Sequence, residues 1–529
     1  MNSGAQVGSS CAGALGPERM RIRELLMLLY ASALTGCTTV DVSETRSRPA
    51  IESLLTERGA PGLGWDRNGA PSNDAEFVEL RAKPMTADLA VRAAMLKSPQ
   101  LQQVYGQLGL ARADVLEAIQ IGNPRIGLSR LALEGGPGAQ FAIGIAQPLA
   151  DLLTLPAKAR LAKLDYERAR YEFAASILGV SLDVESGWYQ SVAAGQVAMM
   201  RAAVAEALQT SAELAQRFYD AGNITQLQFN REKAAATQAR IEAAQASVAA
   251  RLARLEVNSL IGLTGKETEW PLDATLPLPV VAEDDPAELQ RIASENSLEL
   301  LAARKGASVA AGAASITRHF RLLGTTTVGY GREREVDRSV IKGPTLDLEL
   351  PIFNQGGSRV ARAEARLKIA RARLAQIELS SANSIALGAE RVRVLSQVVT
   401  DYRSALVPER ETVARESQLE QNYALIGEFE VLQARAQQFD AYQGLIEAVR
   451  DYWLARLDLS RLVGRRLPSD ALPRQRAVTP ADYLSPKPTS SVRPAGGHQH
   501  GGAPATPVEP PSSPTAIPTP TEHHPGAQS

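Results

Sequence analysis

The chain has 529 residues, a formal net charge of -1 at pH 7 and an aromatic content of only 5%. So few aromatic side chains in so long a chain argue against several ordinary globular cores and favour long helices that pack through small side chains. The balanced charge provides no electrostatic footprint for DNA or RNA, which excludes nucleic acid as a partner.

The N-terminus has the pattern of an export signal. Arg21 and Arg23 precede a short apolar run over residues 25–31, and small residues follow it. This order of basic, apolar and small residues predicts an export signal over residues 1–36, with an apolar region too short for a transmembrane helix. Met20 is an alternative start of translation, because the residues before it would be an unusual prefix to such a signal.

The signal ends in the tetrad Leu34-Thr35-Gly36-Cys37, which resembles a bacterial lipobox. The resemblance implies that Cys37 carries lipid, palmitate included, as the first residue of the mature protein. The alternatives are an ordinary export signal and a buried thiol. Proline and glycine recur over residues 37–85, which predicts an extended tether that follows the lipid anchor.

A first repeat is predicted over residues 86–264. It begins with a helix, which Thr86 caps and Pro124 terminates. Two short alternating runs follow and predict strands at about 123–131 and 139–149. An alanine-rich stretch then predicts a long helix, and after a glycine-containing break a shorter helix completes the repeat.

The same pattern returns at an offset of about 203 residues. A linker is predicted over residues 265–286, and the second repeat over residues 287–464, with strands at about 320–332 and 341–352. Both repeats close on a similar tripeptide, Leu260-Ile261-Gly262 in the first and Leu462-Val463-Gly464 in the second. A repeat this long indicates a duplicated domain half and not a solenoid unit.

Apolar and polar residues alternate most clearly in the last predicted strand. Leucines at positions 346, 348 and 350 alternate with Thr345, Asp347 and Glu349. A soluble sheet over a core produces the same pattern, but strands of about 10 residues are also long enough to cross a bilayer when tilted. In that interpretation the leucines face lipid, while Thr345, Asp347 and Glu349 line a water-filled lumen.

The strand number implies an oligomer. One chain supplies about four strands, which cannot close a barrel, and open sheet edges are not tolerated in lipid. The long helices favour a hollow column, with a simple antiparallel coiled-coil rod as the alternative. The predicted fold class is therefore mainly α with a transmembrane β-barrel, built from duplicated strand-strand-long-helix halves.

The C-terminal composition changes abruptly to Pro, Gly, Ser, Thr and Ala, which predicts a disordered tail over residues 465–529. This tail contains four of the five histidines of the chain, namely His498, His500, His523 and His524. Clustered imidazoles in a flexible segment bind copper, zinc or nickel weakly. The alternative is a solvated extension without a metal role.

Export signal, lipobox and repeat together resemble a TolC-family outer-membrane factor over residues 86–464. The most specific local match is the segment Leu425-Ile426-Gly427-Glu428-Phe429-Glu430-Val431-Leu432-Gln433-Ala434-Arg435. The resemblance implies a homotrimer with a 12-stranded barrel in the outer membrane of a Gram-negative bacterium and an α-helical periplasmic tunnel. It also implies a periplasmic adaptor protein and an inner-membrane efflux pump, of the RND type, as partners.

The resemblance also implies a gate at the tunnel mouth. Glu430 matches a position where family members carry a carboxylate, whereas Gln433 and, in the first repeat, Gln228 stand at positions where further acidic residues would complete the set. Three copies of Glu430 would form a ring of the kind that cation pathways use. The alternative is a solvated carboxylate near a helix N-terminus.

The expected function is a passive duct for heavy-metal ions, copper above all. The form of the segment 425–430, which resembles members that accompany heavy-metal pumps, and the tail histidines favour this cargo. An outlet for drugs or secreted polypeptides is the alternative, and a non-conducting periplasmic coiled-coil lipoprotein scaffold is the rival from another class.

An enzyme is not expected, nor is a cofactor. His319 is a solitary histidine among basic and apolar neighbours. The segment Gly262-Leu263-Thr264-Gly265-Lys266 lacks the spacing and the Ser or Thr of a phosphate-binding loop. Energy for transport would have to come from a partner.

Overall fold

The computed structural model describes residues 44–60, 74–132, 134–136, 138–271, 276–323 and 326–471. The chain divides into two units, Met1–Leu484 and Ser485–Ser529, and all described residues belong to the first. The predicted export signal with Met20, the lipidated Cys37 and the tail histidines lie outside the described residues.

The fold consists of two similar halves and is mainly helical, as predicted. The first half has the order α4 (Ala87–Lys97), α5 (Pro99–Ile119), β1 (Arg125–Ala132), β2 (Ala139–Pro148), α6 (Leu149–Asp220) and α7 (Gln226–Ile261). The second half has the order α8 (Pro286–Asn296), α9 (Leu298–His319), β3 (Thr327–Arg334), β4 (Val340–Asp347), α10 (Gly357–Asp401), α11 (Val407–Asn422) and α12 (Glu428–Val463).

Each half begins with two helices instead of one. Thr86 caps α4 by accepting a hydrogen bond from the Leu89 N–H at 3.3 Å, and Asp285 caps α8 in the same way. A serine then separates the two helices of each half, Ser98 in the first and Ser297 in the second. Both serines have extended backbone angles, so the chain bends there before α5 and α9 begin.

The strands form one antiparallel sheet in the order β1-β2-β3-β4. Two strand bounds differ from the prediction, because β3 begins at Thr327 and β4 ends at Asp347. These two residues pair with each other, so the chain beyond Asp347 has no strand opposite to it. Glu349, predicted inside a strand, therefore lies beyond the end of the sheet.

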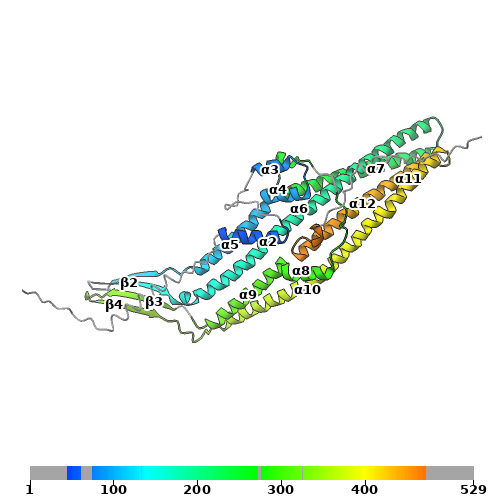
Figure 1. The fold of residues 1–529 in the computed structure, drawn as a ribbon. Helices are drawn as coiled ribbons and strands as arrows, with labels where there is room; N and C mark the ends of the chain where they lie inside the picture. Colours follow the sequence, from blue (N-terminus) through cyan, green and yellow to red (C-terminus); the bar gives the residue numbers. More distant parts are fainter. Residues whose placement is uncertain are drawn as a thin grey trace, which may run out of the picture. The chain divides into compact units, whose positions relative to one another are not determined.

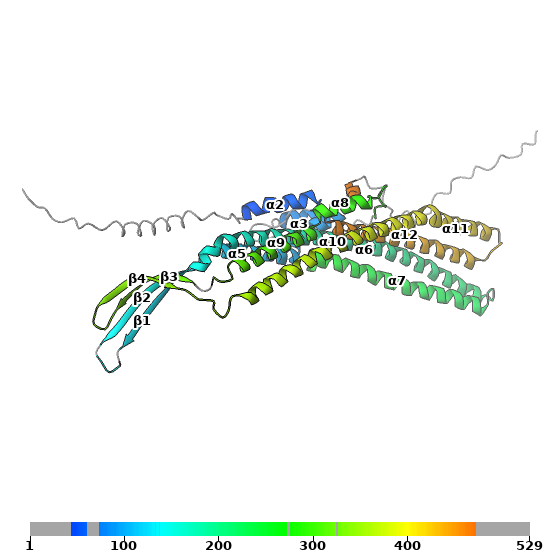
Figure 2. The same cartoon turned by 90° about the horizontal axis from the view of Figure 1, so that it is seen from below.

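The sheet lies at one end of the helices (Figure 1). α6 follows β2 directly, and the Leu149 N–H donates to the Thr326 carbonyl oxygen at 2.8 Å where the two halves meet. At the other end, the turn between α6 and α7 and the turn between α11 and α12 form two helical tips (Figures 1 and 2).

The core lies in the middle of the helices. In α6, the apolar residues that recur at spacings of three and four from Phe173 to Trp188 are buried. Tyr189 stacks on Trp453 of α12 with ring centroids 5.4 Å apart, which joins the two halves. Trp188 donates its indole N–H to the Met85 carbonyl oxygen at 2.8 Å, and Trp453 donates to that of Pro277 at 2.7 Å.

The predicted extended tether over residues 37–85 is wrong in two places. Residues Glu44–Glu57 form α2, and residues Asp74–Arg81 form α3. Ile51 and Leu55 of α2 are buried, as is Phe77 of α3. These spaced apolar residues explain the helices, because they give each one a face that packs on the core.

The predicted disordered tail is wrong over residues 465–471. Arg456 of α12 is only 1% exposed, and it donates hydrogen bonds to Asp470 at 2.7 Å and to Ser469 at 2.6 Å. The other terminal nitrogen of the guanidinium, Nη1, donates to Glu283 at 2.5 Å. A buried guanidinium needs such partners, so Arg456 holds both the tail start and the linker against the second half.

The two long helices of the repeat differ. The helical segment of the second half that follows β4 contains a π-helical turn, Tyr402–Leu406, between α10 and α11. Pro408 follows this turn at the start of α11. Proline has no N–H to bond to the preceding turn, so the wider turn accommodates it. α6 has no such turn over its 72 residues.

A glycine closes each half in the same way. Gly262 after α7 and Gly464 after α12 have φ angles of 89° and 80°, in the left-handed region. Each lies against the break between the two opening helices of its half: an added Cβ on Gly262 would lie 2.8 Å from the Lys97 oxygen, and one on Gly464 would lie 2.8 Å from the Ser297 Cα. Only glycine fits both the angle and the space.

We therefore predict that Gly262→Ala and Gly464→Ala each destabilise the chain. The left-handed backbone alone costs about 1–2 kcal/mol with a side chain, and the contact with backbone atoms adds to it. Thermal unfolding followed by circular dichroism measures the loss. Gly109→Ala in α5 is the control, since its Cβ would meet no atom within 4 Å and alanine favours a helix by roughly 0.5–1 kcal/mol. Unchanged unfolding of both cap variants would contradict the prediction.

Candidate functional site

The sheet has two different faces. In an antiparallel sheet directly paired residues share a face, and neighbours along a strand alternate. Gly127 pairs with Gly144, Gly144 with Gly331, and Gly331 with Gly343, so four glycines form a row across one face. A shallow cavity of about 530 Å³ lies along this row. We call this side the glycine face.

The predicted lumen residues lie on this side of the sheet. Thr345 pairs with Gly329, and Asp347 pairs with Thr327, which places Thr345 and Asp347 on the glycine face. The Thr327 hydroxyl donates to Asp347 at 3.1 Å. Glu349 lies beyond the sheet, so the register brings together two of the three predicted residues.

The opposite side, which we call the apolar face, is exposed. It carries large aliphatic and aromatic side chains from all the strands: Ile126, Leu128, Phe141, Ile143, Ile145, Val328, Tyr330, Val340 and Leu346. Leu128 is 76% exposed and Leu346 is 64% exposed. An exposed apolar surface of this extent indicates contact with an apolar environment or partner.

The predicted gate residues lie at the helical tips. Glu430 and Gln433 are exposed on the first turns of α12. Gln228 is the equivalent residue of α7, and its side-chain oxygen accepts a hydrogen bond from the Thr225 N–H at 2.9 Å. Thr225 in turn caps Gln228, which completes a capping box. Gln228 thus has a structural role that the sequence analysis did not identify.

Carboxylates of the two tips lie near each other. Glu232 of α7 accepts a hydrogen bond from Ser211 at 3.0 Å. Burial raises the pKa of Glu232 above its ordinary value, the Ser211 hydrogen bond opposes this shift, and the negative charge of Glu428 adds to it. Acidic side chains of both halves therefore contribute to the electrostatics of the tip region.

Arg201 joins the two halves above the tips. From α6 it contacts Glu242 of α7 at 3.1 Å and Asp440 of α12 at 3.0 Å. It also donates a hydrogen bond to the Gln443 side chain at 2.7 Å. Because its partners come from both halves, a movement of α12 away from α6 would break part of this group.

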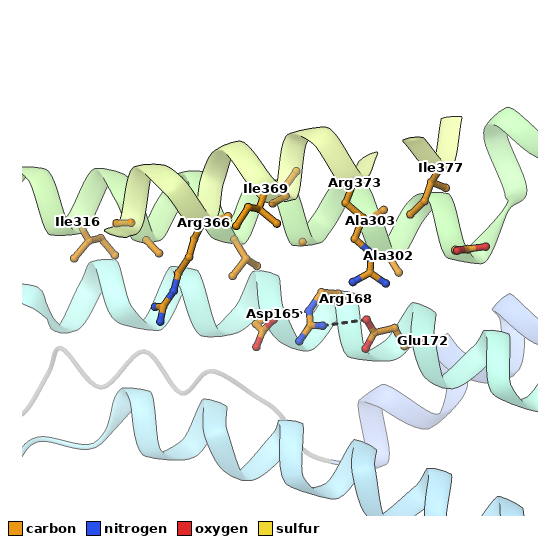
Figure 3. A pocket seen from close by; sticks show the side chains of 18 of the residues that line it. Asp165, Arg168, Glu172, Ala302, Ala303, Ile316, Arg366, Ile369, Arg373 and Ile377 are labelled. Atoms are coloured by element: carbon orange, nitrogen blue, oxygen red, sulfur yellow. Dashed lines mark hydrogen bonds and ion pairs between the residues drawn. The ribbon is translucent and has the colours of Figure 1, made fainter. Parts of the chain in front are cut away.

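A groove of about 1210 Å³ runs between α6 and α10, with α9 as its floor (Figure 3). Small residues of α9 make the floor, among them Ala302 and Ala303. On the α6 wall, Arg168 donates to Asp165 at 2.7 Å and to Glu172 at 3.0 Å. The hydrogen bond to Asp165 raises the pKa of Arg168, so this guanidinium stays charged.

The α10 wall of the groove is basic. Arg359, Arg362, Arg366 and Arg373 line it, and Figure 3 shows Arg366 and Arg373 extending from α10 over the groove. Arg359 donates to the Arg321 carbonyl oxygen at 2.8 Å. Along the described chain, the other three pair with no carboxylate. The sequence analysis missed this groove, although the spaced arginines after residue 358 were its signal.

Among the described residues, no cluster of three or more His, Cys, Asp or Glu side chains could hold a metal ion. His319 is exposed, and its Nδ1 lies 2.8 Å from the Ser315 carbonyl oxygen. None of the helices in the described ranges combines the length and the apolarity needed to cross a membrane.

Known structures share this fold. The outer membrane protein VceC from Vibrio cholerae superposes with a TM-score of 0.59 and 15% identity, over 72% of this chain and 96% of that one. The Campylobacter jejuni CmeC outer membrane channel has a TM-score of 0.59 and 11% identity, over 76% and 90% of the two chains. CusC, whose crystal structures concern folding and transmembrane channel formation, superposes with a TM-score of 0.57 and 14% identity. The match covers 77% of this chain and 99% of CusC.

No protein-family profile matches the chain, and no curated protein sequence matches it. The structural likeness shows that the chain has the fold of an outer-membrane channel. The predicted mainly helical fold with a small antiparallel sheet, similar to that of TolC-family channels, is thereby confirmed, whereas the trimer and its 12-stranded barrel stay predictions.

The two tips share a left-handed backbone position but differ in the residue that occupies it. Gly222 in the first tip and Ala424 in the second both have positive φ angles, 74° and 57°. The hydrogen bonds around them match, since the Asn223 N–H donates to Phe218 and the Leu425 N–H donates to Glu420. Alanine is strained in this conformation, and glycine is not.

We predict that Ala424→Gly stabilises the second tip by roughly 0.5–1 kcal/mol, and that Gly222→Ala destabilises the first by at least as much. Hydrogen exchange of the Leu425 and Asn223 amides reports each tip separately. Slower exchange of Leu425 in the first variant and faster exchange of Asn223 in the second are expected. Exchange rates of the Leu425 and Asn223 amides that change equally and in the same direction in the two variants would contradict this prediction.

Proposed function

We propose that three copies of this chain close into a 12-stranded barrel in the outer membrane. One observation carries the proposal: the sheet has an exposed apolar face, a glycine face, and two edge strands, β1 and β4. Unpaired edges are not tolerated in lipid, and barrel closure removes them. The apolar face then contacts lipid, and the glycine face with Thr345 and Asp347 lines the lumen.

The same closure makes the helices a tunnel. α6 follows β2 directly, and α10 follows β4 after a short segment, so a ring of strands continues as a ring of helices. The groove between α6 and α10 is concave, and the concave side of a helical layer faces inward when layers close into a tube. In such a tunnel, the groove arginines would line the wall.

The complete role is the outer-membrane duct of a tripartite efflux system. Solved structures with this fold are described as outer membrane channels, which supports the duct. A periplasmic adaptor and an inner-membrane pump of the RND type supply energy and cargo, and lipid on Cys37 anchors each copy. A scaffold that conducts nothing would have no use for the exposed apolar face.

Opening would occur at the tips. Three Glu430 side chains would form a ring at the mouth, and the ring would widen when α11 and α12 move outward after partner docking, a shift between two states. The contact of Arg201 with Asp440 resists this movement, because it joins α6 to α12.

The proposed cargo is a heavy-metal ion, copper first, supported by the form of the segment 425–430 and by the tail histidines. A second candidate, an organic anion such as a drug, is favoured by the groove, where Arg362, Arg366 and Arg373 lack carboxylate partners among the described residues.

Conductance in planar bilayers tests the duct and the gate. We predict that the parent protein conducts and that Glu430→Ala raises its open probability and lowers its preference for cations, because the variant removes three charges from the mouth. Glu409→Ala, an exposed carboxylate of α11 away from the tip, is the matched control. Absence of conductance in both the parent and Glu430→Ala would refute the duct, and identical conductance of parent and variant would refute the gate alone.

Growth of a gene-deletion strain tests the cargo. We predict sensitivity to copper that a plasmid copy of the gene reverses, measured across copper, silver, zinc, cobalt, detergents and antibiotics. Sensitivity to antibiotics or detergents without sensitivity to metals would reject the metal cargo and favour the organic anion. A truncation after Leu484 then separates the histidine tail from the channel, because copper efflux that depends on the tail is lost in this variant.

A further inference from the structure

Four cationic side chains gather on the apolar face at the end of the sheet that carries the hairpin turns. Arg130 lies on β1, Arg332 and Arg334 on β3, and Lys342 on β4. Arg332 pairs with Lys342, while Arg130 and Arg334 both pair with Phe141. The four therefore occupy two adjacent rows. We call this group the basic rim.

The basic rim has no ion-pair partner in the part of the chain that the structure describes. Along the described residues, no carboxylate forms an ion pair with it, and its one aromatic contact places the Arg130 guanidinium 5.5 Å from the Phe141 ring centre. The carboxylates of the strands, Glu333 and Asp347, project from the glycine face. The remaining nearby carboxylates lie in the turns beyond the strands: Glu134, Glu335 and Asp337.

The position of the rim along the sheet is defined by the topology. The helices attach to the opposite ends of the strands, so the hairpin turns emerge on the membrane side away from the helices. Below the rim, the rows of the apolar face hold Ile126, Ile145 and Leu346 and no charge. Along the sheet toward the hairpin turns, apolar rows are followed by cations. A membrane has the same order, because its hydrocarbon layer is followed by the lipid headgroups.

We infer that the basic rim binds the phosphate groups of anionic lipids in the membrane leaflet away from the helices. Long arginine and lysine side chains extend along an apolar surface and place their charged ends at headgroup level. Guanidinium groups bind phosphate oxygens with paired hydrogen bonds. This inference rests on the proposed barrel, in which the apolar face contacts lipid.

The neighbours of the cations favour a lipid phosphate over a free one. Leu128, Phe141 and Val340 share the two rows of the rim and are exposed. A free phosphate ion would gain nothing from these side chains. A molecule that has acyl chains directly next to its phosphate would contact both kinds of residue at once.

Lipid retention by the full-length protein tests the inference. The protein is purified in detergent, mixed with bisphosphorylated lipid A, monophosphorylated lipid A or phosphatidylcholine, and analysed by native mass spectrometry. We expect retention in the order bisphosphorylated, monophosphorylated, phosphatidylcholine. A variant with all four rim residues changed to glutamine should retain at least tenfold less bisphosphorylated lipid A than the parent protein. Inorganic phosphate should not displace the lipid from the parent protein.

The control removes the same number of charges elsewhere. Its four substitutions to glutamine are on exposed cations of α7, namely Arg231, Lys233, Arg240 and Arg251. This variant should retain lipid A as the parent does. Equal loss in both quadruple variants, or equal retention in the parent and the rim variant, would overturn the inference, as would displacement by inorganic phosphate.

A bilayer measurement on the same samples separates this inference from the proposed function. If the parent conducts and retains lipid A no better than phosphatidylcholine, only the rim inference fails. If the parent neither inserts nor conducts, the barrel fails, and the rim inference fails with it. A rim variant that conducts normally but has lost lipid A supports both.

Discussion

Backbone hydrogen bonding at the edges of the sheet is the constraint on which the rest of the structure depends. β1 and β4 each have a neighbour on one side only, and their outer N–H and C=O groups need partners wherever water is absent. In the proposed membrane barrel, the exposed apolar face lies in such an environment. Neighbouring copies are the simplest source of those partners, because β4 of one copy can pair with β1 of the next. In the proposed trimer, this closure directs the glycine face inward and arranges the attached helices in a ring.

The duplication gives the two halves of the chain equivalent joints. In each half, a glycine with positive φ ends the last helix and lies against the break between the opening helices, so Gly262 and Gly464 hold equivalent joints. The two halves differ in three features of the second half. It contains the π-helical turn before Pro408, the strained Ala424 and the buried Arg456. Each of these changes either the path of α10 to α12 or the attachment of the tail start.

Much of this fold could be predicted from sequence, because its signals are local. Period-two alternation marked β2 and β4, and the closing glycines marked both repeat ends. Three features could not be predicted, since they depend on distant residues. The start of β3 is set by its pairing with β4, α2 is stabilised by burial of Ile51 and Leu55, and residues 465–471 are ordered by Arg456. The arginines of the groove are evident in the sequence as closely spaced residues after position 358. Only the fold shows that they lie opposite α6.

The electrostatics of the proposed tunnel do not require one sign of charge along its whole length. Salt screens exposed charges beyond about 8 Å at physiological ionic strength, so the arginines of the groove influence a passing ion only where the tunnel is narrow. At the tips, burial raises the pKa of Glu232, and the negative charge of Glu428 from the other half adds to this shift. In a passive duct the narrowest ring has the greatest effect on which ions enter. The charge at Glu430 therefore bears on cation passage more directly than the basic wall above it, and a metal cargo is compatible with both.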